Sequence, residues 1–226
     1  MTSSVNFSHA PGLPDRVLCV LGMHRSGTSC LTGTLQEAGI FLGDCHTWNP
    51  YNQKGNRENQ RVVDINDAVL AQNGGSWDHP PATVTWSKAS LAAAHQLLAD
   101  HGDADNFGFK DPRTLLVLDG WRSLYPTMQL VGIFRHPLAV AGSLARRDGM
   151  AIQDGLALWY QYNRRLYRYW QQAPFPVLCF DDPLEEFNRK VAAVIRESGI
   201  GDAEHVGEFY DKGLKSERPR RDQALP

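Results

Sequence analysis

Short apolar runs recur along the chain, and each is followed by a turn and a segment with helical spacing. The first run, Arg16 to Gly22 (RVLCVLG), precedes a helix-compatible segment that closes at Gly39. The second run, Leu130 to Phe134, is followed by a turn and by a helix from Leu138 to Arg147 that Gly149 stops. Each unit therefore has the order strand, loop, helix.

A third unit has the same order nearer the end of the chain. Residues 176–180 (PVLCF) form another apolar run, and an acidic turn over residues 181–183 leads to a helix from Leu184 to Ser198, which Gly199 ends. Short apolar strands separated by helices predict an α/β fold, with a central parallel sheet flanked by helices on both faces. In such folds ligands bind at the carboxyl ends of the strands.

Helices and loops fill the stretch between the first two units. Residues 56–74 and 87–100 have helical spacing, whereas the Gly and Pro content of residues 73–86 predicts a loop. A later helix over residues 155–172 carries an aromatic stripe that we expect to face the core. The stripe consists of Leu156, Trp159, Tyr160, Leu166, Tyr167 and Trp170.

Length and composition describe an ordinary globular protein. A chain of 226 residues suits a single domain over residues 1–226, with flexible ends at 1–15 and 219–226. A net charge of -2 argues against wrapping nucleic acid, so any anion site must be local. The amino terminus lacks the features of a signal peptide and no stretch is apolar enough to span a membrane, which predicts a cytoplasmic protein with reduced cysteines.

Residues 21–30 (LGMHRSGTSC) carry the strongest chemical signal. Against the phosphate-binding pattern G-x-x-x-x-G-K-[ST], Gly22, Gly27 and Ser29 match, but Thr28 stands where the nucleotide-binding lysine belongs. A cation occurs three residues earlier, as Arg25. Because that lysine serves the β- and γ-phosphates, its absence argues against nucleoside triphosphate hydrolysis and favours a ligand with a 5′-phosphate and a less charged leaving group.

The same loop has the parts needed to hold such a phosphate. Small residues such as Ser26 and Gly27 let backbone N–H groups approach an anion, and the following helix adds the positive end of its dipole. Thr28 and Ser29 would supply hydroxyl donors. The alternative is a strand-to-helix turn that binds nothing.

Two motifs together resemble a known family. GMHRSGTS resembles the 5′-phosphosulfate loop of sulfotransferases that use 3′-phosphoadenosine 5′-phosphosulfate (PAPS), in its bacterial R-S-G-T-S form. FRHPLAVAGS resembles the 3′-phosphate motif of that family, which assigns 3′-phosphate binding to Arg135 and Ser143. The resemblance implies a three-layer P-loop fold of the nucleotide-kinase type, with PAPS as donor and adenosine 3′,5′-bisphosphate as product.

A third motif narrows the resemblance to a subgroup. Residues 108–113 (GFKDPR) resemble the K-D-P segment of tyrosylprotein sulfotransferases and their bacterial relatives, which implies that Lys110 stabilises the transferring group. Lys110 could instead be a surface lysine before a turn. Arg113 could reach a phosphate or pair with Asp111.

The catalytic base is sought on the acceptor side. By the resemblance, Glu58 in GNRENQ follows a glycine-containing loop at the distance expected of the base. His24, His46 and Asp64 are the alternative bases. Glu58 could instead have a structural role, as a carboxylate that complements the dipole at the start of a helix.

The segments that would select the acceptor are the least informative. The resemblance weakens over residues 44–107, which form the acceptor side in this family. Near the end of the chain, Lys212, Lys215 and Arg218 are either a solvated basic tail or a loop that closes over the 3′-phosphate.

The sequence therefore predicts transfer of a sulfuryl group from PAPS to a hydroxyl acceptor, in line and without a required metal. Arg25, Glu58 and Lys110 are the predicted catalytic residues, and the donor is assigned to residues 25–29 with Arg135 and Ser143. We expect the acceptor to be a small molecule or carbohydrate rather than a protein. The rival functions are a P-loop small-molecule kinase and a catalytically silent nucleotide-binding relative.

Overall fold

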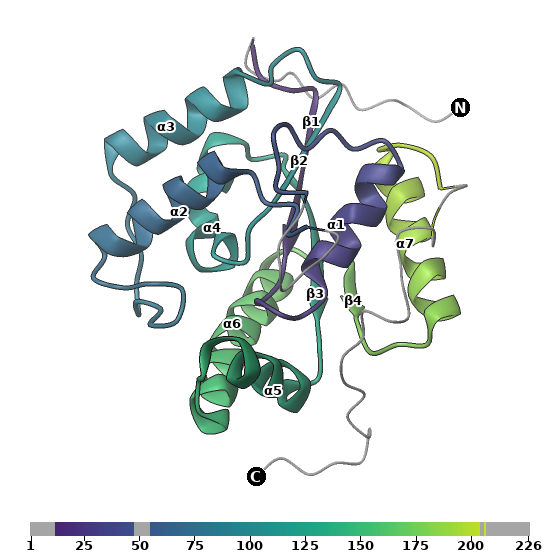
Figure 1. Cartoon of the computed structure of the whole chain (residues 1–226). Helices are drawn as coiled ribbons and strands as arrows, with labels where there is room; N and C mark the ends of the chain where they lie inside the picture. The colour runs from purple at the N-terminus through teal and green to yellow at the C-terminus, as the bar shows by residue number, and fades with distance from the viewer. Residues whose placement is uncertain (1–11, 48–54, 204–205, 207–226) are drawn as a thin grey trace.

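Four short parallel strands form the centre of the structure, a computed structural model that describes residues 12–47, 55–203 and 206 (Figure 1). Their order across the sheet is β2-β1-β3-β4, so β1 is paired on both sides. The strands are β1 (Arg16–Leu21), β2 (Asn106–Lys110), β3 (Gln129–Phe134) and β4 (Val177–Cys179).

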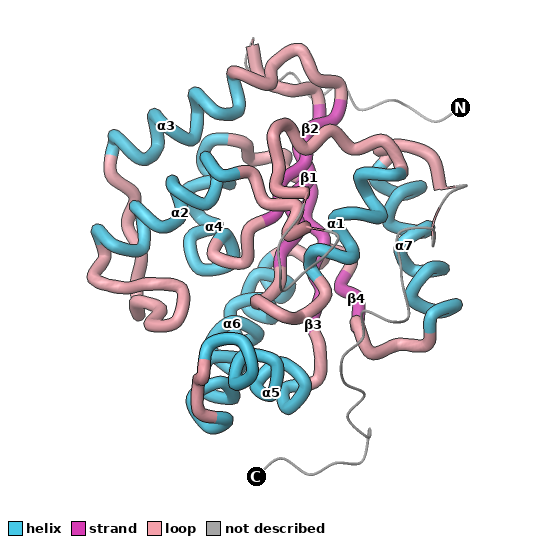
Figure 2. The backbone as a smooth tube through the Cα atoms, in the orientation of Figure 1, coloured by secondary structure: helices cyan, strands magenta, loops and turns pink. Residues whose placement is uncertain are grey.

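Helices cover both faces of this sheet (Figure 2). One face is covered by α1 (Thr28–Glu37) and α7 (Leu184–Ser198). The other face is covered by α2 (Gln60–Gln72), α3 (Lys88–Ala99), α4 (Thr114–Leu124), α5 (Pro137–Asp148) and α6 (Ile152–Gln172).

Strand β1 shows why the core has two halves. Val17, Cys19 and Leu21 face the cluster beneath α2 to α6, whereas Leu18 and Val20 face the cluster beneath α1 and α7. Successive side chains of a strand point to opposite faces, so a strand that is apolar throughout needs cover on both sides. The predicted α/β fold with a covered parallel sheet is therefore confirmed.

Most predicted elements are found within a few residues of their expected ends. The helix over Leu184–Ser198 matches α7, and the predicted second strand matches β3 apart from its first residue. Strand β2 and helix α4 were not predicted as elements. Strand β2 reads NFGFK, which is short, has glycine at its centre and ends in lysine, so its pattern alone does not distinguish it from a loop.

The prediction for the aromatic stripe of α6 is wrong for half of its members. Tyr160, Tyr167 and Trp170 are 60%, 58% and 40% exposed. The buried face of the helix contains Leu166 of the predicted stripe together with Leu158, Tyr162 and Tyr169, and the spacing of three and four residues keeps these side chains on one side. With aromatic residues on several sides of the helix, composition could not identify the buried face.

Other expectations concern the cysteines and the ends of the chain. All four cysteines are free thiols. No helix in the described part of the chain is both long and apolar enough to cross a bilayer. The predicted flexible ends lie mostly outside the described residues, and so do Lys212, Lys215 and Arg218.

A buried polar network joins α2 to the turn that follows β2. Asn66, fully buried on α2, donates from Nδ2 to Asp111 Oδ2 (2.8 Å) and to Thr114 Oγ1 (2.9 Å). Its Oδ1 accepts a hydrogen bond from Trp121 Nε1 at 2.9 Å. Burial raises the pKa of Asp111, while the neighbouring Arg113 opposes this shift.

We predict that Asn66→Ala lowers the free energy of unfolding by about 3 kcal/mol, because Oδ2 of the buried Asp111 loses its amide donor and the buried indole N–H of Trp121 loses its acceptor. Gln96→Ala is the matched control, since Gln96 makes the same amide-to-carboxylate contact to Asp100 on the surface of α3. It should change stability by about 0.5 kcal/mol or less. Urea unfolding measures both, and equal losses would contradict the role given to the buried network.

Candidate functional site

The phosphate loop connects β1 to α1 in a conformation that leaves the start of the helix uncapped. Arg25 and Gly27 both have positive φ angles, 65° and 87°. Gly27 is the N-cap of α1, and no side chain caps the helix there. The first N–H groups of a helix have no partner within it, so this turn is suited to an anion.

Ser26 provides an independent indication that the loop is built for a ligand. Its side chain is fully buried, yet its Oγ has no hydrogen-bond partner among the described residues. Its backbone N–H already donates to Met23 O at 3.3 Å, so the side-chain hydroxyl is the group of Ser26 that still needs a hydrogen-bond partner. A buried hydroxyl without a partner is costly, and a phosphate oxygen in the loop would satisfy it.

Three predicted donor-binding residues meet beside this loop. Arg25 Nε donates to Ser143 Oγ at 2.8 Å, joining the phosphate loop to α5. Arg135, at the end of β3, donates from Nη1 to the backbone oxygen of Arg25 at 3.4 Å. Because β1 and β3 are parallel neighbours, the turns at their carboxyl ends lie side by side.

The turn that carries Arg135 is held by residues from the neighbouring segments. Asp181, just after β4, accepts from the His136 N–H at 2.7 Å and pairs with Arg135 Nε at 3.5 Å. The guanidinium also lies 5.4 Å from the centre of the Phe180 ring. Trp159 of α6 donates to the backbone oxygen of Arg135 at 2.9 Å. Arg135 is therefore fixed before any ligand arrives.

Lys110 and Glu58 form a pair on the other side of the loop. Lys110, the last residue of β2, is 1% exposed, and its Nζ lies 2.8 Å from Glu58 Oε1. The same ammonium donates to Ser29 Oγ at 3.3 Å, and Ser29 in turn donates to Asn56 O. Lys110 is thus not a surface lysine, and it links the start of α1 to the loop before α2.

The segment after Lys110 has a structural role. Arg113 forms ion pairs with Asp111 (2.9 Å) and with Asp67 of α2 (2.6 Å). Of the two roles considered for Arg113, phosphate binding and pairing with Asp111, the structure shows the pairing. Asp111 is fully buried and also accepts from the Arg113 N–H. This turn fixes the end of β2, and thereby Lys110.

The alternative bases occupy different places. His46 is exposed, and its backbone pairs with that of Glu58 (N–O 2.9 Å). Asp64 is exposed on α2 and accepts from Gln60 Nε2 at 2.6 Å. His24 lies in the phosphate loop, and its Nε2 is shielded from solvent and has no hydrogen-bond partner among the described residues. Its ring centre is 4.7 Å from that of Trp77. Of the candidates, Glu58 is the one that contacts Lys110.

Positive charge is concentrated at the loop. Burial, followed by the guanidinium groups of Arg147 and Arg135, lowers the pKa of Arg25. Burial also lowers the pKa of His24, with further contributions from Arg113 and Arg147. A bound anion would relieve this repulsion, so the electrostatics agree with the geometry of the loop.

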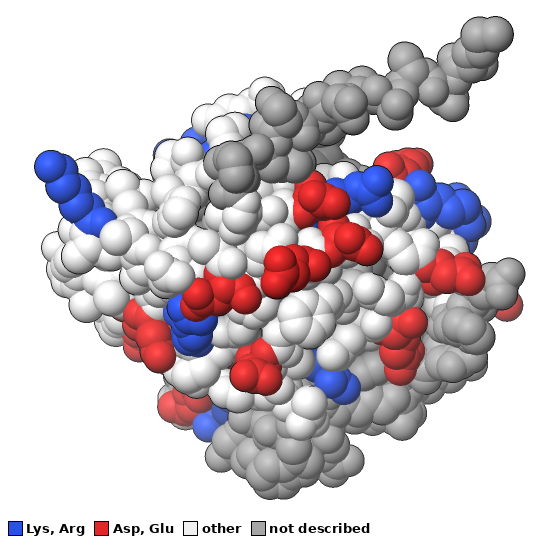
Figure 3. Space-filling model, turned by 90° about the horizontal axis from the view of Figure 1, so that it is seen from above, with Lys and Arg blue, Asp and Glu red and all other residues white. Residues whose placement is uncertain are grey.

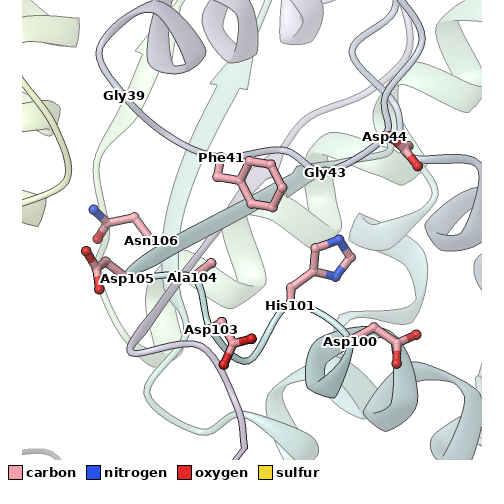
Figure 4. A pocket seen from close by; sticks show the side chains of 10 residues that line it. All are labelled: Gly39, Phe41, Gly43, Asp44, Asp100, His101, Asp103, Ala104, Asp105 and Asn106. Atoms are coloured by element: carbon pink, nitrogen blue, oxygen red, sulfur yellow. The ribbon is translucent and has the colours of Figure 1, made fainter.

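A separate pocket of about 640 Å³ lies at the opposite end of β2 (Figure 4). It contains Phe41 and His101 together with four carboxylates, and Figure 3 shows Asp and Glu side chains gathered on the face from which the strands start. Its acidic residues are Asp44, Asp100, Asp103 and Asp105. Such a pocket is unsuited to phosphates, and none of the predicted site residues lines it.

Comparison with known proteins agrees with this site. A family model described as "Sulfotransferase family" matches residues 18–197, which include both predicted anion-binding turns and Lys110. The chain belongs to the sulfotransferase family. A comparison with curated proteins finds no match. The relation to tyrosylprotein sulfotransferases stays a prediction.

Two solved structures resemble this sulfotransferase. One is the sulfotransferase domain of the olefin synthase from Synechococcus PCC 7002, with a TM-score of 0.56 and 15% identity over 90% of this chain and 80% of that one. Another is the sulfotransferase STF1 from Mycobacterium tuberculosis H37Rv, with a TM-score of 0.48 and 17% identity over 83% and 68%. At this identity the first likeness shows the fold alone.

Sequence reasoning missed several residues that shape the site of this sulfotransferase. Asp181 supports the turn of Arg135, and Trp77 contacts both His24 and Arg147. Asp181 had a usable signal, because it follows a strand at the edge where the other site residues gather. Trp77 had none, since it lies in a loop whose position depends on tertiary contacts.

We predict that His24 contributes to acid destabilisation of the apoprotein. Its lowered pKa keeps it neutral when folded, whereas the unfolded chain binds a proton near the ordinary histidine value of about 6.5. Below that pH, stability should therefore fall by up to about 1.4 kcal/mol per pH unit from this residue. Urea unfolding between pH 5 and 7 should show a shallower slope for His24→Asn, and an unchanged slope would contradict the burial of this imidazole.

Proposed function

We propose that this sulfotransferase transfers the sulfuryl group of PAPS to a hydroxyl acceptor. The observation that carries the proposal is the hydrogen bond from Arg25 Nε to Ser143 Oγ, with Arg135 beside it. The two turns that would bind anions thus adjoin, as a nucleotide with phosphates at both its 5′ and 3′ positions requires. The family match supports the reaction class.

On the donor side, the uncapped start of α1 and the Ser26 hydroxyl would hold the 5′-phosphate. The backbone N–H groups of residues 27–29 are available in the first turn of the helix, whereas that of Ser26 is engaged with Met23. Arg135 and Ser143 would bind the 3′-phosphate and so select PAPS over ATP. A planar guanidinium that is already oriented suits such a doubly charged group.

On the acceptor side, Glu58 would accept the proton of the attacking hydroxyl. Lys110 and Arg25 would stabilise negative charge on the transferring group and on the leaving oxygen, since Lys110 is buried and Arg25 is half-buried beside the loop. Protein cations can meet this charge, so we propose that no metal is required. The acceptor is proposed to be a small molecule or a carbohydrate.

Thermal stabilisation by nucleotides tests the proposal. Adenosine 3′,5′-bisphosphate at about 100 times its dissociation constant should add about 2.7 kcal/mol of stability. This stabilisation should not depend on magnesium, and ATP should give much less. Magnesium-dependent stabilisation by ATP would support a small-molecule kinase, and nucleotide binding without turnover of any acceptor would support a catalytically silent relative.

We predict that Arg135→Ala weakens binding of adenosine 3′,5′-bisphosphate by roughly 10- to 100-fold, because a charged hydrogen-bond donor to the 3′-phosphate is lost. With saturating donor, kcat should change far less. Arg189→Ala, which removes an exposed arginine from α7, is the control. Calorimetric titration measures the affinity, and native affinity in Arg135→Ala would remove the assignment of this residue.

We predict the opposite pattern for Glu58→Gln. Glutamine keeps an oxygen that can accept from Lys110 but is not a base, so kcat should fall by roughly 100-fold or more while bisphosphate affinity stays near native. Asp64→Asn is the matched control on an exposed carboxylate and should retain activity. A greater loss of kcat in Asp64→Asn than in Glu58→Gln would move the base to Asp64.

A further inference from the structure

Helix α6 has an outer face that no other element covers. Its buried face packs against α4 and α5 (Figure 1). On the opposite side, exposed residues recur at intervals of three and four, which places their side chains in one line along the helix. This line, the outer seam of α6, consists of Ala157, Tyr160, Arg164, Tyr167 and Gln171, all of which are exposed.

Large exposed side chains are concentrated on this helix. Of the six large hydrophobic side chains that are exposed in the described part of the chain, four lie on α6. The rings of Tyr167 and Trp170 stack on each other, with their centres 5.9 Å apart and their planes at 19°. Tyrosine and tryptophan supply contact area at a low cost in conformational entropy and are common at binding hot spots. The outer seam therefore has the composition of an interface.

The charge of the outer seam is positive. No acidic residue occurs between Gly155 and Gln172, whereas Arg164 lies at the centre of the seam and the exposed Arg168 lies one turn further on. Arg168 is placed over the ring of Tyr169 at 5.1 Å. The side chain of Arg164 has no hydrogen bond or ion pair with the residues that the structure describes. A complementary surface would thus be apolar around a central carboxylate.

Two other occupants fit this surface less well. If two copies of the chain paired in antiparallel orientation across the centre of the seam, the two Arg164 guanidinium groups would meet, and like charges repel strongly in an interface that excludes water. A helix that lies on a lipid surface buries a face rich in residues such as leucine and phenylalanine. The three central residues of the outer seam, Tyr160, Arg164 and Tyr167, instead all carry polar groups.

We propose that the outer seam of α6 is a docking surface for an acidic amphipathic helix of another protein. The spacing of three and four residues matches the spacing by which two helices pack along a common seam. The partner helix would place apolar side chains against Tyr160 and Tyr167 and a carboxylate against Arg164. The inference is independent of the proposed function, because the seam residues are not among those assigned to the donor or to the acceptor.

A synthetic helical peptide tests the charge at the centre of the seam. The peptide has the length of α6, leucines to face the two tyrosines and a glutamate to face Arg164, and a second peptide has lysine in place of that glutamate. Calorimetric titration of the full chain should show at least 10-fold tighter binding of the glutamate peptide. Arg164→Glu should reverse this preference. Arg189→Glu, an exposed site on α7, is the matched control and should keep it.

The aromatic residues are tested by truncation. Tyr167→Ala should weaken the glutamate peptide by roughly 10-fold, because an aromatic contact at the centre of the interface is lost. Phe41→Ala is the matched control, since Phe41 is 52% exposed but lies at the pocket beside the start of β2. It should change the affinity by less than about 2-fold. Circular dichroism checks that each variant is folded.

Four results would overturn the proposal. Equal affinity for the glutamate and lysine peptides, or equal losses in Tyr167→Ala and Phe41→Ala, would show that binding is not specific to the seam. Sedimentation that detects a dimer in the native chain and a monomer in Tyr167→Ala would assign the seam to a second copy. Binding to vesicles of phosphatidylcholine and phosphatidylserine that Tyr167→Ala abolishes would assign it to a lipid surface.

Discussion

The hydrogen bond from Arg25 to Ser143 joins segments that are 118 residues apart, and the organisation of the site depends on it. It can form because β1 and β3 pair in parallel, which brings the turn after each strand to the same edge of the sheet. Arg25 has a left-handed backbone conformation, and its side chain reaches Ser143 of α5. A central strand paired on both sides gives this arrangement its rigidity.

Burial of a charged residue at the site costs free energy of folding, but it also strengthens the interaction of that residue with a bound anion. Lys110 is almost fully buried, so its charge needs Glu58 nearby, and the pair recovers only part of the cost of leaving water. The same low-dielectric surroundings strengthen the interaction of each cation with a bound anion. The Asn66–Asp111 network serves this site because it fixes the turn that follows Lys110.

The sequence was sufficient for the features that are local. The apolar run that ends in glycine predicted the turn between β1 and α1, and glycine residues predicted where α5 and α7 end. The sequence was insufficient to predict which side chains are buried where burial depends on residues distant in the chain. Tyr160 and Tyr167 of α6 could not be assigned to solvent from their type, and Trp77 reaches His24 only because α6 holds its loop.

Carboxylates lie beside most of the cations at the site and differ in how they affect each one. Lys110, Arg135 and Arg147 each contact a carboxylate, from Glu58, Asp181 and Asp148 respectively. Such partners orient a cation at the expense of part of its attraction for an anion. Arg25 instead donates to a neutral hydroxyl. Since Arg25 lies in the loop that leads into α1, its charge and the uncapped N–H groups at the start of the helix would act on the same anion.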